Sequence, residues 1–193
     1  VTGYGESLVK AALRIDEGVV ETMAHYRAAA HLNPGVTSVI DIGGQDTKVI
    51  LVRGGRVVDF IMNDKCSAGT GKFLEIMANR MGVTLPELFE LAERGREITI
   101  SSMCTVFAES EIVSLMGLGT PREDIACGAV RSVVAKVAVQ AARKAAADAY
   151  FLTGGFCDSA MVLRKLSEAL HAPVRTHPDA RFAGAIGAAL LGK

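Results

Sequence analysis

The pattern of apolar and polar residues along the first third of the chain predicts one helix followed by three strands. Residues 1–5 are typical of a strand end that runs into a turn. Glu21 to Leu32 is rich in alanine, carries apolar residues at helical spacing and is ended by Asn33-Pro34-Gly35. A Gly-Gly pair predicts a hairpin between the last two of three β-rich runs, which lie at about residues 36–42, 46–53 and 56–63.

The rest of the chain predicts helices that alternate with short strands. Thr84 with Glu87, and Thr120 with Glu123, form two capping boxes that mark helix starts. Because strands come first and helices alternate with short strands afterwards, we expect an α/β fold with a mixed sheet flanked by helices. One helix is expected directly after the glycine-rich loop at 66–71 and a second after Thr84. Further helices are expected at about 105–115, 121–147 and 159–170 and from about 180 onward. Short strands are expected at 150–153 and near Val174.

Composition narrows the class of protein. The chain has 193 residues, which is enough to bury a core in one or two domains. Its 21 basic and 21 acidic residues give no support for a nucleic-acid or anionic-membrane partner. No apolar run approaches the ~18 residues of a membrane span, and four cysteines without tight spacing favour a reducing, cytoplasmic location. The chain starts at Val1 rather than Met, so we expect it to be a piece of a longer protein.

The stretch Asp41-Ile42-Gly43-Gly44-Gln45-Asp46 is the first candidate site. It lies between two apolar runs and is typical of a hairpin turn whose adjacent glycines allow close backbone approach. Exposed N–H groups at such a turn bind anions such as phosphate. Asp41 and Asp46 could then orient a water or a hydrated Mg²⁺ beside that phosphate. The alternative is an ordinary glycine hairpin with solvated acids.

Two further glycine clusters strengthen a nucleotide-binding interpretation. Gly69-Thr70-Gly71 opens a predicted helix, and Gly154-Gly155 lies between a strand and a helix. Each places backbone N–H groups, or the positive end of a helix dipole, where an anion could bind. One such turn is weak evidence, but three in one α/β unit favour a nucleotide site. An alanine- and glycine-rich helix after residue 180 is explained at least as well by close helix packing.

The four cysteines fall into two kinds. Cys66 and Cys104 each lie in a polar loop of small residues that leads into a predicted helix, a position that favours the metal-binding thiolate. Cys127 and Cys157 are expected to be small buried apolar residues. An iron–sulfur cluster needs four thiolates, which a symmetric dimer could supply from Cys66 and Cys104 of both copies. The alternative, that both are unreactive loop cysteines, stays open because the chain has no CxxC pair.

Other polar residues carry weaker signals. His25 and the other three histidines are scattered without metal-ligand spacing, so we interpret them as structural or surface residues. Glu109 and Glu111 follow Cys104 on a predicted helix, and we expect exposed helical acids there; the alternative is that one of them faces the nucleotide or the cluster.

Three motifs together carry a resemblance to a known family. They are residues 39–46 (Val-Ile-Asp-Ile-Gly-Gly-Gln-Asp), 62–71 (Met-Asn-Asp-Lys-Cys-Ser-Ala-Gly-Thr-Gly) and 104–111 (Cys-Thr-Val-Phe-Ala-Glu-Ser-Glu). The chain resembles the activators (archerases) of 2-hydroxyacyl-CoA dehydratases and the ATPase subunits of benzoyl-CoA reductase over essentially its whole length. The two cysteine motifs are specific to that family, whereas the glycine pairs are shared across the actin, Hsp70 and sugar-kinase superfamily.

The resemblance implies a ribonuclease-H-like ATPase fold and an electron-transfer function. It implies a homodimer that holds one [4Fe–4S] cluster through Cys66 and Cys104 of both copies, with Mg²⁺ and ATP or ADP bound between two lobes. ATP hydrolysis would be coupled to delivery of a low-potential electron, received from ferredoxin or flavodoxin, to a partner dehydratase or reductase. The implied catalytic residues are Asp41 and Asp46, and the implied cofactor contacts are Gly43, Gly44, Gln45, Lys48, Gly69, Thr70, Gly71, Gly154 and Gly155.

Two departures from the family pattern qualify these expectations. The family begins with an Asp-x-Gly-Ser/Thr phosphate motif that this chain does not carry, so we expect an N-terminally truncated chain with an incomplete first lobe. Residues 1–34 would be the remnant of that lobe and residues 35–193 the second lobe, with the last helix, about 180–193, packed back on the first. Gly154-Gly155 is followed by Phe156-Cys157-Asp158-Ser159 in place of small residues and Asn, so adenosine contacts are expected to differ.

Two other functions remain open at this point. The chain could be a sugar or small-molecule kinase of the same superfamily, in which Cys66 and Cys104 are incidental. It could also be a non-catalytic fragment that dimerises without turning over ATP, so hydrolysis by this chain stays undecided.

Overall fold

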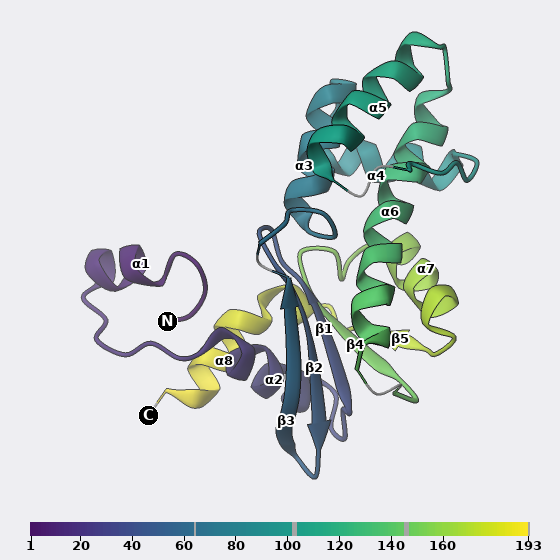
Figure 1. Ribbon diagram of the computed structural model, residues 1–193. Helices are drawn as coiled ribbons and strands as arrows, with labels where there is room; N and C mark the ends of the chain where they lie inside the picture. Colours follow the sequence, from purple (N-terminus) through teal and green to yellow (C-terminus); the bar gives the residue numbers. More distant parts are fainter. Residues whose placement is uncertain (64, 102–103, 145–146, 193) are drawn as a thin grey trace.

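The fold is built on one mixed five-stranded sheet, with strand order β3-β2-β1-β4-β5 (Figure 1). The computed structural model describes residues 1–63, 65–101, 104–144 and 147–192. The hairpin-connected strands pair antiparallel, β4 joins β1 in parallel, and β5 joins β4 in parallel. This confirms the predicted mixed sheet. The strands are β1 (Ser38–Ile42), β2 (Thr47–Arg53), β3 (Arg56–Asn63), β4 (Tyr150–Gly154) and β5 (Val174–Arg175).

Helices cover both faces of the sheet (Figure 1). On one face α6 (Arg122–Ala142) packs beside α7 (Ala160–Leu170), and on the other α2 (Glu21–Leu32) packs against α8 (Ala183–Leu191), which a short 3-10 turn precedes. The α2–α8 contact is very close, because a Cβ atom built at Gly187 would lie 1.8 Å from the Ala24 carbonyl oxygen. All five residues of β1 and of β4 are buried, so the core lies on both sides of these central strands.

A helical subdomain extends from one end of the sheet (Figure 1). It consists of α3 (Gly71–Met81), α4 (Leu85–Arg94) and α5 (Thr105–Gly117), which pack on one another and on the first half of α6. The predicted capping box of α4 is confirmed, since the Thr84 hydroxyl accepts from the Glu87 N–H and the Glu87 carboxylate accepts from the Thr84 N–H.

Three local predictions were wrong, one about a strand end and two about the bounds of a helix. The turn predicted within residues 1–5 is found at Tyr4-Gly5, but no strand precedes it: Gly3 lies in a bend with φ +91°, and α1 (Glu6–Leu13), which has no buried residue, follows. Helix α6 starts after Pro121, whose extended backbone makes it the N-cap, so Thr120 lies too early to form a capping box. The same helix ends at Ala142, before the charged pair Arg143-Lys144, rather than near residue 147.

Helix α6 is the one helix in the described part of the chain that is long and apolar enough to cross a membrane. Most of its apolar window is buried inside the protein, where it packs on α4, α7 and β2. A core helix of this kind passes the same test of length and composition, so the observation is weak evidence for a membrane span.

Candidate functional site

The turn formed by residues 41–46 joins β1 to β2 and rests on the start of α3; we call it the nucleotide turn after the ligand that the sequence predicts for it. The Gly43 N–H donates to the Asp46 carbonyl at 2.9 Å, which closes the turn. The Gly43 and Gly44 carbonyls accept from the N–H groups of Gly71 (2.9 Å) and Lys72 (2.8 Å), the first two residues of α3. These two N–H groups at the helix start therefore already have protein partners.

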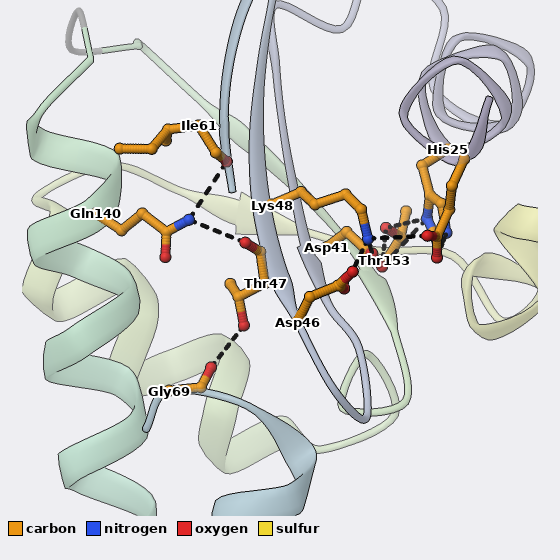
Figure 2. A network of polar contacts seen from close by, with 10 residues as sticks. His25, Asp41, Asp46, Thr47, Lys48, Ile61, Gly69, Gln140 and Thr153 are labelled. Carbon is orange, nitrogen blue, oxygen red and sulfur yellow. Dashed lines mark hydrogen bonds and ion pairs between the residues drawn. The ribbon is translucent and has the colours of Figure 1, made fainter. Parts of the chain in front are cut away.

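A buried ammonium group lies among three carboxylates beside the nucleotide turn. The Lys48 Nζ atom is 2.6 Å from Asp46, 3.3 Å from Glu21 and 3.5 Å from Asp41 (Figure 2). Lys48 and Asp41 are almost completely buried, whereas Glu21 is partly exposed. We call these four residues the carboxylate cluster. With one positive and three negative side chains it carries a formal net charge of −2, which suits a divalent cation.

The carboxylate cluster controls the protonation of Lys48. Burial acts to lower the pKa of Lys48, but the charge of Asp41, the hydrogen bond to Asp46 and the charges of Glu21 and Asp46 together raise it above its ordinary value of 10.5. Lys48 is therefore a permanent cation at neutral pH, and it holds Asp41 and Asp46 in place from the interior of the protein.

His25 and Thr153 complete the environment of Asp41. The His25 Nδ1 atom lies 3.1 Å from an Asp41 carboxylate oxygen and 3.1 Å from the Thr153 hydroxyl, which donates to that same oxygen at 3.0 Å (Figure 2). Ligand atoms of Glu21, His25 and Asp41 lie within 4.8 Å of one another, so these side chains also have the composition of a metal site. Sequence reasoning missed His25, Glu21 and Thr153, because they come from α2 and β4 and no local motif connects them to Asp41.

A cavity of about 420 Å³ opens beside the carboxylate cluster. Glu21 and Asp46 line it, together with Tyr4, Val19, Val20 and Met62. The exposed residues Gly44 and Gln45 form the outer edge of the nucleotide turn. Glu21 and Asp46 can therefore reach a ligand or cation in this cavity directly, whereas the buried Asp41 does not line it.

A second cavity, of about 520 Å³, lies at the predicted adenosine motif. Gly155 lines it and donates its N–H to the Ile42 carbonyl at 3.2 Å, and Gly154 approaches that carbonyl so closely that a Cβ there would lie 2.3 Å away. The glycine pair is thus brought against the start of the nucleotide turn. The remaining lining mixes apolar and charged groups from α4, from residues 156–160 and from the 3-10 turn before α8: Leu85, Pro86, Phe89, Glu90, Glu93, Phe156, Asp158, Ser159, Ala160 and Arg181.

Two other residues predicted to contact a cofactor, Gly69 and Thr70, form hydrogen bonds with groups of the protein itself. The Gly69 carbonyl accepts from the Thr47 hydroxyl at 2.6 Å, and the buried Thr70 hydroxyl donates to the Ser67 carbonyl at 2.7 Å. Gly69 has φ +88°, and a Cβ there would lie 2.8 Å from the Lys136 side chain. The contacts of Gly69, Thr70 and Gly71 with a cofactor stay a prediction, as do those of Gly43, Gly44, Gln45, Lys48, Gly154 and Gly155.

Cys66 and Cys104 are both exposed, and their loops are tied together. The hydroxyls of Ser67 and Thr105, the residues that follow them, are 2.8 Å apart and share a hydrogen bond. Cys104 is the N-cap residue of α5, and the Ser101 N–H donates to Glu111 of that helix at 2.9 Å. Two exposed thiols on neighbouring loops fit half of a four-thiolate cluster site, and a second copy of the chain would supply the other half.

The two remaining cysteines are buried. Burial raises the pKa of the Cys127 thiol, and burial together with the Asp158 charge raises the pKa of the Cys157 thiol to about 11. Both thiols are therefore neutral at physiological pH, which agrees with their predicted role as small apolar residues. Glu109, expected to be an exposed acid, pairs with Arg80 of α3.

The arrangement of the sheet and helices defines the structural class of the protein. The mixed sheet with helices on both faces is the ribonuclease-H-like fold of the actin, Hsp70 and sugar-kinase ATPases. A ROK-family glucokinase from Streptomyces griseus, solved with glucose and AMPPNP, matches with a TM-score of 0.56 at 17% identity, covering 96% of this chain and 71% of that chain. At this identity the likeness shows the fold alone, and it confirms the expected fold.

The chain belongs to the BadF/BadG/BcrA/BcrD ATPase family, whose model matches residues 1–192. The chain is 44% identical to the uncharacterized protein YjiL of Escherichia coli K12, over all of this chain and 75% of that protein. It is 43% identical to the (R)-2-hydroxyglutaryl-CoA dehydratase activating ATPase of Acidaminococcus fermentans, over 98% of this chain and 72% of the relative. The expected family is therefore confirmed.

A solved structure supports the same assignment. The activator of the 2-hydroxyisocaproyl-CoA dehydratase from Clostridium difficile, solved with bound ADPNP, matches with a TM-score of 0.91 at 35% identity. The match covers 98% of this chain and 70% of that chain. The chain therefore shares its architecture with that activator over 98% of its own length.

Proposed function

We propose that this protein is an ATP-dependent activator that delivers a low-potential electron to a 2-hydroxyacyl-CoA dehydratase or a related CoA-substrate reductase. The observation that carries the proposal is the pairing of two exposed thiols, Cys66 and Cys104, on loops joined by the Ser67–Thr105 hydrogen bond. The Cys66 loop leads directly into α3, whose first two N–H groups donate to the nucleotide turn, and Cys104 is the N-cap residue of α5. A sugar kinase of this fold would have no use for it, so it favours the activator over the kinase alternative.

The nucleotide would bind across the two cavities. The glycine pair and the charged and aromatic lining at Gly155 suit the adenosine, and the nucleotide turn with its carboxylate cluster suits the phosphates and Mg²⁺. Asp41 and Asp46 would orient the hydrated ion, and Asp46, which lines the open cavity, is the more accessible of the two. Lys48, whose partners are these carboxylates, would act by positioning them rather than by contacting phosphate.

The cysteines of two copies would hold one [4Fe–4S] cluster between them, and a bound cluster supplies one-electron chemistry. Apolar side chains that α5 leaves exposed next to Cys104 support a homodimer at this end of the molecule, namely Val106, Phe107 and Val113. Ferredoxin or flavodoxin would be the electron donor, in the cytoplasm. We further propose that residues 1–34 belong to a first lobe and 35–193 to a second, with the last helix, α8, packed back on α2 of the first.

Iron content under anaerobic conditions tests the proposal. The protein should purify as a brown dimer with about four iron and four sulfide per dimer, and Cys66→Ala or Cys104→Ala should each abolish this. Cys127→Ala is the control, because that thiol is buried inside the protein. A colourless dimer that phosphorylates a sugar would establish the kinase alternative instead. A brown dimer without ATP hydrolysis would support the non-catalytic alternative.

A further inference from the structure

Thr47 and Lys48 connect the start of β2 to two different parts of the molecule. Successive side chains on a strand point to opposite faces, so Lys48 contacts the carboxylate cluster while Thr47 points the other way (Figure 2). The fully buried Thr47 hydroxyl donates to the Gly69 carbonyl at 2.6 Å. Gln140 of α6 donates to the Thr47 carbonyl at 2.9 Å and to the Ile61 carbonyl at 3.3 Å. The start of β2 is thus fixed to the loop that contains Cys66.

Hydrogen bonds continue from this point to both exposed cysteines. One residue beyond Gly69, the Thr70 hydroxyl donates to the Ser67 carbonyl, and the Ser67 hydroxyl meets Thr105, the neighbour of Cys104. Asn63, at the end of β3, donates to the Cys66 carbonyl at 3.0 Å and to the Ala68 carbonyl at 2.8 Å. Each step is a short side-chain contact rather than a flexible linkage.

The Cys66 loop is therefore held to the nucleotide turn on two sides. The Thr47 hydroxyl donates to the Gly69 carbonyl of this loop. Just beyond the loop, the N–H groups of Gly71 and Lys72 donate to the Gly43 and Gly44 carbonyls. The Thr47 contact is the only one of these made by a side chain, so a substitution can remove it without altering the backbone.

We propose that Thr47 is a positioning residue that fixes the Cys66 loop to the nucleotide turn, so that a displacement of the turn is passed to both cysteine loops. The transmission of movement rests on the proposed function, because it needs a bound nucleotide and a cluster. The Thr47–Gly69 hydrogen bond itself can be tested without either. Loss of the Thr47 hydroxyl leaves the buried Gly69 carbonyl without that donor and weakens the attachment of the loop. A displacement of the nucleotide turn would then move the Cys66 loop less, and through the Ser67–Thr105 hydrogen bond it would move Cys104 less.

Hydrogen exchange of the backbone amides tests the contact in the cluster-free protein. Thr47→Val should accelerate exchange over residues 65–72 about fivefold, the factor that corresponds to one buried hydrogen bond. Thr47→Ser, which keeps the hydroxyl, should restore exchange to near the wild-type rate. Thr37→Val makes the same change at an exposed threonine before β1 and should leave this segment unaffected. Wild-type exchange over residues 65–72 in a folded Thr47→Val protein would overturn the proposal.

Addition of Mg-ADP provides a second readout that a merely structural role would not change. In the wild type, the nucleotide should slow exchange both in the nucleotide turn and over residues 65–70. In Thr47→Val, protection of the turn should persist while protection of residues 65–70 is lost. Equal protection of both segments in the two proteins would contradict the relay. If Mg-ADP protects nothing in the wild type, the proposed nucleotide function fails, whereas the nucleotide-free comparison still decides the role of Thr47.

Discussion

Lys48 and Asp46 form the shortest contact of the carboxylate cluster, with the almost completely buried Nζ atom of Lys48 2.6 Å from Oδ1 of Asp46, which lines the cavity. Asp41 and Glu21 lie within 3.5 Å of the same ammonium group. A single lysine therefore compensates acids contributed by α2, the end of β1 and the nucleotide turn.

Replacement of Lys48 should be costly for this reason. Lys48→Met removes the cation and leaves buried carboxylates without their partner, so we expect a loss of on the order of 3 kcal/mol in the free energy of unfolding. Lys72→Met breaks only the exposed pair with Glu75 and should cost less than about 1 kcal/mol. Urea denaturation followed by circular dichroism measures the free energy of unfolding of both variants. Equal losses would show that Lys48 does not stabilise the carboxylate cluster.

The raised pKa of Lys48 predicts a specific loss of stability at alkaline pH. The folded protein holds this proton more tightly than the unfolded chain, so the stabilisation is complete below pH 10.5 and declines as the pH rises through the higher pKa of the folded state. Cys157, whose pKa is also raised, titrates in both the wild type and Lys48→Met and cancels in their difference. That difference should shrink above pH 10.5, and a difference that stays constant to pH 12 would contradict the prediction.

The cysteines should divide into two reactive classes. At pH 8, iodoacetamide should modify Cys66 and Cys104 of the cluster-free protein, because both are exposed. Cys127 and Cys157 should react only after unfolding, since burial raises the pKa of each thiol. Peptide mapping by mass spectrometry separates the four sites, and rapid modification of Cys157 in the folded protein would show that its pKa is not raised.

The α2–α8 contact can be tested with two glycines of one helix. Gly187→Ala would place a Cβ 1.8 Å from the Ala24 carbonyl, so the helices must separate, at a cost of about 3 kcal/mol. Gly184→Ala meets its nearest atoms at 3.5 Å and should be neutral or stabilising by up to about 1 kcal/mol. Because α2 carries Glu21 and His25, Gly187→Ala should also weaken Mg-ADP binding measured by calorimetry. Similar denaturation midpoints for the two variants would refute the close packing.

The elements that the sequence predicted well are those with strong local signals. Asn33-Pro34-Gly35 ends α2 where expected, and the Thr84–Glu87 capping box starts α4. The weaker Thr120–Glu123 pattern failed because the backbone of Pro121 shifts the helix start by one residue. Helix α1, short and without buried residues, offers too little apolar periodicity to be found.

In the candidate site, too, the parts with strong local sequence signals were predicted and the parts without them were missed. The nucleotide turn and Cys66 and Cys104 were identifiable from sequence because each is a compact motif. The surroundings of the turn were not, because His25 reaches Asp41 from α2 and Thr153 reaches it from β4, more than 100 residues further along the chain. The Thr47–Gly69 hydrogen bond likewise depends on how the sheet meets α3, which no local pattern encodes.

Nucleotide bound at the Asp41–Asp46 turn is expected to act on the environment of Cys66 and Cys104. The most direct measurement is the rate at which a chelator removes iron from the anaerobically purified protein, with and without Mg-ATP. We expect the nucleotide to change this rate at least several-fold, and Asp46→Asn to abolish the change while the iron content is retained. An iron-loaded protein that binds Mg-ATP but loses iron at the same rate with and without it would contradict the account.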